Sequence, residues 1–101
     1  MKTKETNNNI ILFAVNNQTE LKNILQYVCD YFGGYSLTNM HGGWLNDNKE
    51  VIQEVSYKLE IIYKATDKES NLLKNLCKFI KVVANQKEVY FYTEQIKLFV
   101  C

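Results

Sequence analysis

The order of apolar and polar positions along the chain predicts four strands and two helices. Residues 10–15 are apolar on both alternations, which is typical of a strand buried in the middle of a sheet. Residues 51–64 show the clearest alternation, with apolar side chains at 51, 55, 57, 59, 61 and 63 and polar ones at 54, 56, 58, 60 and 64. This segment therefore predicts a long strand with one apolar and one polar face.

Two segments carry apolar residues at helical spacing. The first follows Asn17 and Glu20, which are spaced as in a capping box, and it ends at Gly33 and Gly34. The second follows a capping-box pattern over residues 66–69 and extends to about Ala84. We expect each helix to bury its apolar stripe against a sheet.

The remaining strands are predicted from residue type and turn composition. Residues 35–45 suit a strand but contain Gly42 and Gly43, so we expect a bulge or bend inside it. A turn composition at residues 46–49 predicts a hairpin with the strand that follows. Residues 88–92 predict another strand, and residues 96–100 a short final strand or an extension of it.

This order of elements predicts the fold class. Strand, helix, two strands, helix, strand is the order of an α+β ferredoxin-like βαββαβ sandwich, in which two helices cover one face of an antiparallel sheet. We expect a flexible tail over residues 1–9, which are polar and lack periodicity, and a single ferredoxin-like domain over residues 10–101. The second face of the sheet then needs another partner.

Net charge and the type of basic residue limit the classes of partner. The formal net charge is +1, from 12 basic and 11 acidic residues, and every basic residue is lysine. Such a chain has no strong field of one sign and no guanidinium that grips phosphate with two hydrogen bonds. We therefore expect neither nucleic acid nor a membrane as a partner.

The cysteines and the N-terminal region point to a cellular compartment. Cys29, Cys77 and Cys101 are too far apart for a C-x-x-C metal or redox motif. Cys29 and Cys77 fall within the apolar patterns of the helices, so we expect them to fill the core. The apolar run at residues 10–15 is too short for a signal peptide or a membrane span. These features predict a cytoplasmic protein, in the bacterial host if a phage encodes it.

Several segments carry a resemblance to a known family. They are residues 32–38 (FGGYSLT), residues 43–44 (GW), Glu54 with Ser56, residues 59–62 (LEII) and residues 85–89 (NQKEV). Over about residues 10–100 they resemble a family of small bacterial and phage proteins of unknown function, with the pattern DG-x-T-V…G-x-W…E-x-S-x-x-L…Q-E-S-V. Gly34 stands at a position that is acidic in this pattern, and Lys87 interrupts its Gln-Glu pair. The resemblance implies a ferredoxin-like fold and no particular activity.

One candidate binding site is the loop around the single histidine. Any Ser-His-Asp triad, Cys-His pair or histidine metal site has to include His41. In the functional interpretation, Trp44 stacks on a flat ligand and His41 supplies a hydrogen bond beside Gly42 and Gly43. In the alternative, the segment is a hairpin bulge and Trp44 covers the core. No recognisable catalytic set, metal site or cofactor motif accompanies the loop, so we expect none.

A second candidate region lies on the helix-free face. If Val89 and Phe91 face the helices, Tyr90 and Tyr92 face outward with one alternation of residues 10–15. We predict that this patch packs against a second copy as a two-fold dimer. The charged side chains at 54, 58, 60 and 64 form either a solvated face or part of a site. The expected ligand-binding residues are Tyr35, His41, Gly42, Gly43, Trp44, Glu60, Tyr90 and Tyr92.

These observations lead to three hypotheses about function. The first is a non-enzymatic small binding protein, a homo-oligomer that sequesters a nucleotide-like small molecule, as a phage anti-defence sponge would. The alternative is a phage-type inhibitor that binds a host protein through its sheet face or edge strand. The third is a small enzyme that depends on His41.

Overall fold

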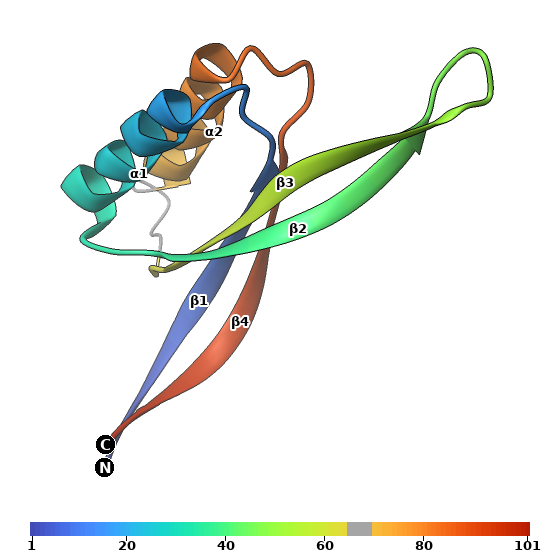
Figure 1. The fold of residues 1–101 in the computed structure, drawn as a ribbon. Coiled ribbons are helices and arrows are strands. Elements are labelled where there is room, and N and C mark those ends of the chain that lie inside the picture. The colour runs from blue at the N-terminus through green and yellow to red at the C-terminus, as the bar shows by residue number, and fades with distance from the viewer. Residues whose placement is uncertain (65–69) are drawn as a thin grey trace.

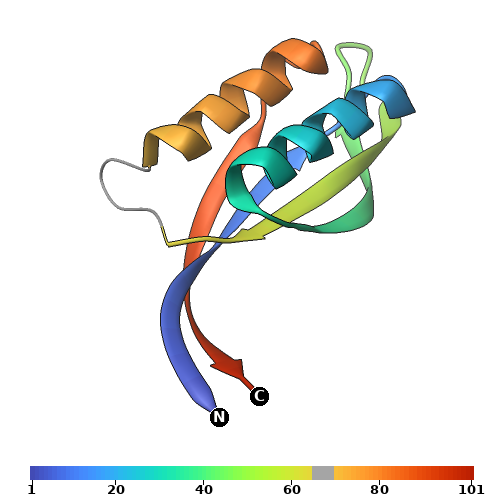
Figure 2. The same cartoon turned by 90° about the vertical axis from the view of Figure 1, so that its left-hand side faces the viewer.

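A computed structural model describes residues 1–64 and 70–101 of the chain. The elements in chain order are β1 (Lys2–Phe13), α1 (Gln18–Phe32), β2 (Ser36–Leu45), β3 (Val51–Ile62), α2 (Ser70–Val83) and β4 (Tyr90–Val100). Figures 1 and 2 show both helices side by side on one face of the sheet. The predicted ferredoxin-like βαββαβ order, with four antiparallel strands and two helices, is confirmed.

The sheet has the order β2-β3-β1-β4, and every neighbouring pair of strands is antiparallel. β1 lies in the interior, paired with β3 on one side and with β4 on the other. Its residues at 10 and 11 are both buried, as expected for a central strand that is apolar on both alternations. β2 and β4 form the two edges.

The N-terminal segment differs from the expected loose tail. β1 starts at Lys2, and its first eight residues pair with β4 from Val100 back to Thr93. The sequence pattern missed this part of the strand because its residues are polar and carry no apolar alternation. Backbone hydrogen bonds to β4 stabilise it instead, and these bonds do not depend on side-chain hydropathy.

Two further strands differ in detail from the prediction. β2 runs through Gly42 and Gly43 without the expected bulge, since these residues pair in continuous register with Glu54 and Gln53 of β3. The C-terminal segment is one strand, β4, so residues 96–100 are the expected extension and not a separate short strand, and the strand begins at Tyr90 where 88 was predicted. Its continuous partner is the extended β1, which the sequence pattern did not reveal.

The ends of α1 follow the predicted signals. The Asn17 side chain accepts a hydrogen bond from the backbone N–H of Glu20 (2.9 Å), and the Glu20 carboxylate accepts one from the backbone N–H of Asn16 (2.8 Å). Gly33 closes the helix in the left-handed region, with φ of 86°, and donates its N–H to the Cys29 carbonyl. The capping-box pattern predicted for the second helix, residues 66–69, lies outside the described residues.

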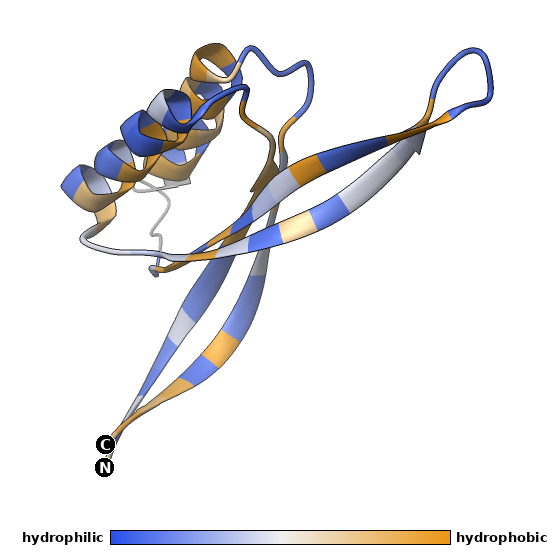
Figure 3. Cartoon of the chain, in the orientation of Figure 1, coloured by the Kyte–Doolittle hydropathy of each residue, from blue (hydrophilic) through white to orange (hydrophobic). Residues whose placement is uncertain are grey.

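Both strand pairs extend beyond the layer of helices. We call residues 1–7 with 95–101 the terminal arm, and residues 40–56 the hairpin arm; Figure 1 shows them pointing in opposite directions. The molecule measures 53 × 24 × 22 Å, and its radius of gyration is 15.2 Å, against about 13 Å for a compact chain of this length. Figure 3 shows apolar segments in both arms, away from the helices.

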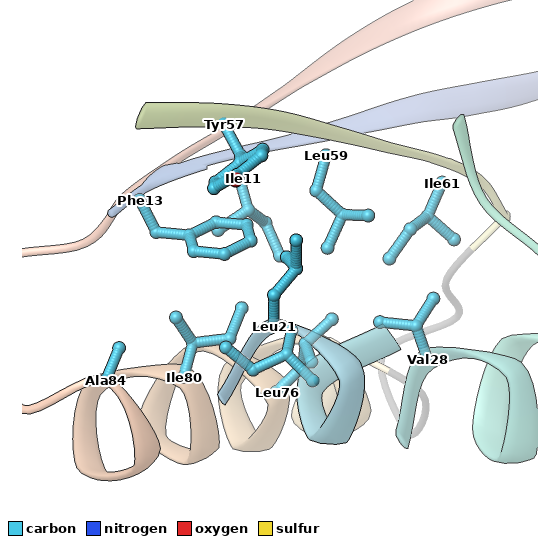
Figure 4. Close-up of a cluster of buried hydrophobic side chains, with 11 residues drawn as sticks. Ile11, Phe13, Leu21, Val28, Tyr57, Leu59, Ile61, Leu76, Ile80 and Ala84 are labelled. Atoms are coloured by element: carbon cyan, nitrogen blue, oxygen red, sulfur yellow. The ribbon is translucent and has the colours of Figure 1, made fainter. Parts of the chain in front are cut away.

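The core lies between the two helices and the middle of the sheet, as Figure 4 shows. β1 and β3 contribute side chains of one parity, including Ile11 and Leu59, which face each other across the strands. α1 and α2 add Val28, Leu76 and Ile80 from their apolar stripes. Only part of the apolar face of β3 therefore belongs to the core. Its residues at 57, 59 and 61 are buried, whereas those at 51 and 55 are exposed on the hairpin arm.

Candidate functional site

The helix-free side of the sheet, which we call the open face, carries the residues of opposite parity to the core. Ile10 of β1 pairs with Glu60 of β3 on one side and with Tyr92 of β4 on the other. Leu12, the next residue of β1 on this face, pairs with Lys58 of β3 and with Tyr90 of β4. Three predicted site residues, Glu60, Tyr90 and Tyr92, are thus brought together on one surface.

A polar cluster occupies the centre of this surface. The Asn8 side-chain amide donates to Glu60 Oε2 at 2.7 Å, and Lys58 Nζ lies 4.0 Å from Glu60 Oε1. Glu94 pairs with Asn8 from the other side, so a second carboxylate belongs to the same face. With two carboxylates and one ammonium group, the cluster carries a net negative charge.

One buried oxygen of this cluster accepts no hydrogen bond within the described chain. Asn8 Oδ1 is buried, and among the described residues it has no hydrogen-bond partner. Beside it, Ile10 is only 1% exposed, although it has the opposite parity to the residues of the helix-covered core. A buried acceptor without a donor lowers the stability of the fold. A ligand or a second chain that donates a hydrogen bond to Asn8 Oδ1 would remove this loss.

The two tyrosines supply aromatic surface at the β4 side. Tyr90 is 61% exposed and Tyr92 42% exposed in the single chain. The hydroxyl of Tyr90 donates to Glu88 Oε2 at 2.6 Å, and this hydrogen bond, with the charge of Glu88, raises the pKa of Tyr90. The Tyr90 phenol therefore stays neutral at physiological pH. Neutral aromatic rings on a sheet can stack against a flat ligand.

The other predicted site residues lie elsewhere. Tyr35 contacts the surface of α1, where it lines a shallow hollow with Leu25 and Cys29. His41, Gly42 and Gly43 line a hollow on the hairpin arm with Val51, Gln53, Glu54 and Val55. Trp44 pairs with Ile52 near the end of that arm and is 53% exposed, so it does not cover the core. The structure thus separates the eight expected residues into three places.

Sequence reasoning missed two residues of the open-face cluster. Asn8 was assigned to the tail, because only a strand that starts before residue 10 places it on the face of Ile10. Glu94 falls between the predicted segments 88–92 and 96–100, and it lies on this face because both belong to one strand, β4. Residues two apart in a strand share a face, so Asn8 lies on the face of Ile10 if the strand is extended towards the N-terminus. The sequence carries no signal for that extension.

The two cysteines of the helices differ in burial. Cys29 is exposed, contrary to the expectation that it fills the core, because it lies outside the buried stripe of α1. Cys77 is half-buried, and this burial raises the pKa of its thiol. Within residues 1–64 and 70–101, no group of three or more His, Cys, Asp or Glu side chains could hold a metal ion. The described helices are too short and too polar to cross a membrane.

No protein-family model matches the sequence, and no curated protein sequence matches it. Solved structures of similar fold do exist. A phage S-adenosylmethionine (SAM) lyase in complex with S-methyl-5′-thioadenosine is similar over 94% of this chain and 90% of its own, with 11% identity and a TM-score of 0.70.

Two further solved structures are similar as well. The PII-like protein CPII of Thiomonas intermedia K12, bound to ADP, AMP and bicarbonate, covers 99% of both chains with 8% identity and a TM-score of 0.63. The B. subtilis GlnK–ATP complex covers 91% of this chain and 82% of its own, with 15% identity and a TM-score of 0.61. At these identities the similarity shows a shared ferredoxin-like fold, one that in other proteins holds small ligands.

Proposed function

We propose that this protein binds a small adenosine-containing molecule on the open face of its sheet. The observation that carries the proposal is the cluster of Asn8, Glu60 and Lys58 beside the exposed rings of Tyr90 and Tyr92. The tyrosines can stack on a purine, and the Glu60 carboxylate and Asn8 Oδ1 can accept hydrogen bonds from hydroxyl or amino groups. The three similar structures each contain an adenine nucleoside or nucleotide, which supports this ligand class.

The charge of the cluster narrows the choice among such ligands. The Glu60 carboxylate lies at the centre of the cluster, bonded to Asn8, and the chain has no arginine with which to grip a polyphosphate. A triphosphate would therefore lack a guanidinium partner here, whereas the Glu60 carboxylate would attract a positively charged sulfonium. S-Adenosylmethionine and uncharged thioadenosines are therefore favoured over ATP.

If the protein binds this adenosine compound without changing it, the proposed function is to sequester the compound. A homo-oligomer would hold the ligand on the open face, shielded by a second copy, and would act as a sponge for it in an infected bacterium. The ligand would leave unchanged when the protein is denatured. Trapping of a host protein instead would be seen as a polypeptide retained by the purified chain.

A second candidate function is cleavage of the same ligand, and the similarity to phage SAM lyase favours it. Release of S-methyl-5′-thioadenosine from S-adenosylmethionine breaks the bond between the sulfonium sulfur and the γ-carbon of the amino-acid chain, and the bonding electron pair stays with sulfur. The step balances if the carboxylate oxygen of the same substrate bonds to that carbon and closes a lactone. Glu60 would then hold the sulfonium ligand in place rather than transfer a proton. This form does not call on His41 of the same chain, which lies on the hairpin arm, apart from the Asn8 cluster.

Calorimetric titration and product analysis together test both candidates. The purified protein is titrated with S-adenosylmethionine, S-methyl-5′-thioadenosine, ADP, ATP and, as a base control, guanosine. We expect the first two to bind more tightly than ATP. Chromatography after incubation with S-adenosylmethionine separates the candidates, since only a lyase leaves free S-methyl-5′-thioadenosine.

Substitutions of carboxylates on β3 test whether the ligand binds at the Asn8–Glu60 cluster. Glu60→Gln keeps an oxygen that can accept the hydrogen bond of Asn8 but removes the charge, so binding of S-adenosylmethionine should weaken roughly ten- to a hundredfold. Glu54→Gln is the matched control, because it has the same parity of β3 but lies on the hairpin arm. Equal losses in both variants, or no binding of any adenosine compound by the wild-type protein, would overturn the proposal.

A further inference from the structure

The two arms carry more exposed apolar surface than a single chain accounts for. On the hairpin arm, Trp44 and Leu45 are half-exposed or more, and Val51 is 69% exposed. On the terminal arm, Phe99 and Val100 are similarly exposed. These residues lie at the far ends of two-stranded segments, which no helix of the described chain covers (Figures 1 and 3). These side chains lie on both faces of their arms, because consecutive residues of a strand alternate. Large apolar side chains that are exposed in this number favour covering by another chain.

The accessible area indicates how large that interface is. The chain exposes 7310 Å², whereas a compact monomer of 11.9 kDa exposes about 6,000 Å². The excess, about 1,300 Å² per chain, is shared between two arms. A contact that joins one arm from each of two copies would then bury about 1,300 Å² in total, which is the size of a standard specific interface.

Opposite charges distinguish the two arms. The terminal arm holds Lys2, Lys4 and Lys97 against one acid, Glu5. The hairpin arm holds Asp47, Glu50 and Glu54 against one base, Lys49. Like arms would therefore repel each other, whereas unlike arms attract.

From these observations we propose that the hairpin arm of each copy lies against the terminal arm of a neighbouring copy, in a closed homo-oligomer. The apolar residues of the two arms form the buried part of the contact, and the lysines and carboxylates form its rim. Two copies that exchange arms reciprocally, or a small ring of copies, both satisfy this arrangement. The inference concerns assembly alone and stands whether or not the open face binds an adenosine compound.

The open face would be enclosed by such an assembly. The apolar residues of the terminal arm on this face, Ile96 and Leu98, continue the same alternation as Tyr90 and Tyr92 along β4. On the hairpin arm, Trp44 and Ile52 continue the alternation of Glu60 along β2 and β3. A neighbouring arm on either segment would border the polar cluster around Asn8.

Trp44 tests the contact in two ways, through its fluorescence and through its substitution. It is the only tryptophan, so its emission reports whether the hairpin arm is covered. We expect light scattering to give a discrete mass above that of one chain, and the emission to shift to the red on dilution. Trp44→Ser should raise the dissociation constant of the assembly roughly thirtyfold or more, since buried tryptophans dominate interfaces. Val82→Ser is the matched control, because Val82 is exposed on α2, away from both arms.

Charge reversal tests which arms meet. One variant carries Lys2→Glu and Lys4→Glu, a second carries Glu50→Lys and Glu54→Lys, and a third combines all four changes. We expect each of the first two to weaken assembly at low salt by roughly tenfold, and the combined variant to return to within about threefold of wild type. Circular dichroism confirms that every variant keeps its fold.

The alternatives give distinct results. A contact between like arms would leave one of the double variants unaffected and would show no recovery when the changes are combined. A wild-type chain that remains monomeric at tens of micromolar would exclude the proposed contact. An unchanged mass for Trp44→Ser, or a Trp44 emission in the assembled wild-type protein that acrylamide quenches fully, would also overturn it.

Discussion

Three consecutive asparagines at residues 7–9 show how strongly position decides the role of a residue type. Asn9 points into the helix-covered side, where its amide donates to the carbonyls of Ile61 (3.1 Å) and Tyr63 (2.9 Å) and its oxygen accepts from Thr93 Oγ1 (2.9 Å). Asn8 points to the open face and retains one unpartnered oxygen within the described chain. Asn7 contributes through its backbone carbonyl, which accepts from the N–H of Tyr63. The side chain of Asn9 therefore stabilises the fold, whereas that of Asn8 is available to a partner.

Replacement of Asn9 by alanine should lower the free energy of unfolding by about 2–4 kcal/mol, because it leaves buried carbonyls and the Thr93 hydroxyl without their partner. Urea denaturation followed by circular dichroism measures the change. Asn7→Ala is the matched control and should cost less than about 1 kcal/mol, since its backbone hydrogen bond survives. Equal losses for the two variants would show that the Asn9 network is not what stabilises this strand.

At the scale of the elements, α1 is specified locally and the strands are not. Its start follows from Asn17 and Glu20, and its end from Gly33, all within a few residues of the boundary. The lengths of β1 and β4 depend instead on backbone pairing between segments at opposite ends of the chain. Pairing partners far apart in the sequence leave no local pattern, so the ends of these two strands were predicted less well than those of α1 and of the β2–β3 hairpin.

The two neighbouring glycines after α1 offer a matched test of this local specification. Gly33→Ala should destabilise the protein by about 1 kcal/mol, because alanine is strained at the positive φ that ends the helix. Gly34→Ala should change stability by less than about 0.5 kcal/mol, since that residue has no positive φ and no atom within 4 Å of an added Cβ. Thermal denaturation of both variants checks the difference. If Gly34→Ala were the more costly change, the assignment of the helix stop to Gly33 would be wrong.

At the scale of the whole molecule, the ratio of surface to core is unusual. The core occupies the middle of the sheet, and both arms extend past it, so the radius of gyration of 15.2 Å exceeds that of a compact chain. A chain with this shape gains stability when a second copy covers the arms. Fold and assembly would then be thermodynamically coupled.

This coupling predicts a stability that depends on concentration. The midpoint of thermal unfolding should rise by several degrees between about 1 and about 100 µM protein, because association withdraws the folded chain from the unfolding equilibrium. Scanning calorimetry at a series of concentrations measures the effect, and Trp44→Ser should reduce it. A midpoint that does not move over this range would contradict the coupling.

The candidate site could be predicted only in part. Tyr90, Tyr92 and Glu60 were placed on the helix-free face from alternation alone, and the register agrees. The pattern pointed to His41 because it is the only histidine, and to Trp44 because it follows the glycine pair beside that histidine, yet both lie on the hairpin arm, apart from that cluster. Rarity of a residue type carries no information about distance in space. Alternation does, because it follows the geometry of the strand.

What the sequence determined by itself was the order of the elements, the α+β class and the buried faces of the helices. Each of these follows from periodicity and from caps, which act between residues close together in the chain. Only the tertiary structure decided that residues 2–9 continue the central strand, that β4 runs unbroken beside it, and that Asn8 meets Glu60. These features arise from backbone pairing between segments that lie far apart in the sequence, and such pairing is indifferent to the polarity of the side chains it aligns.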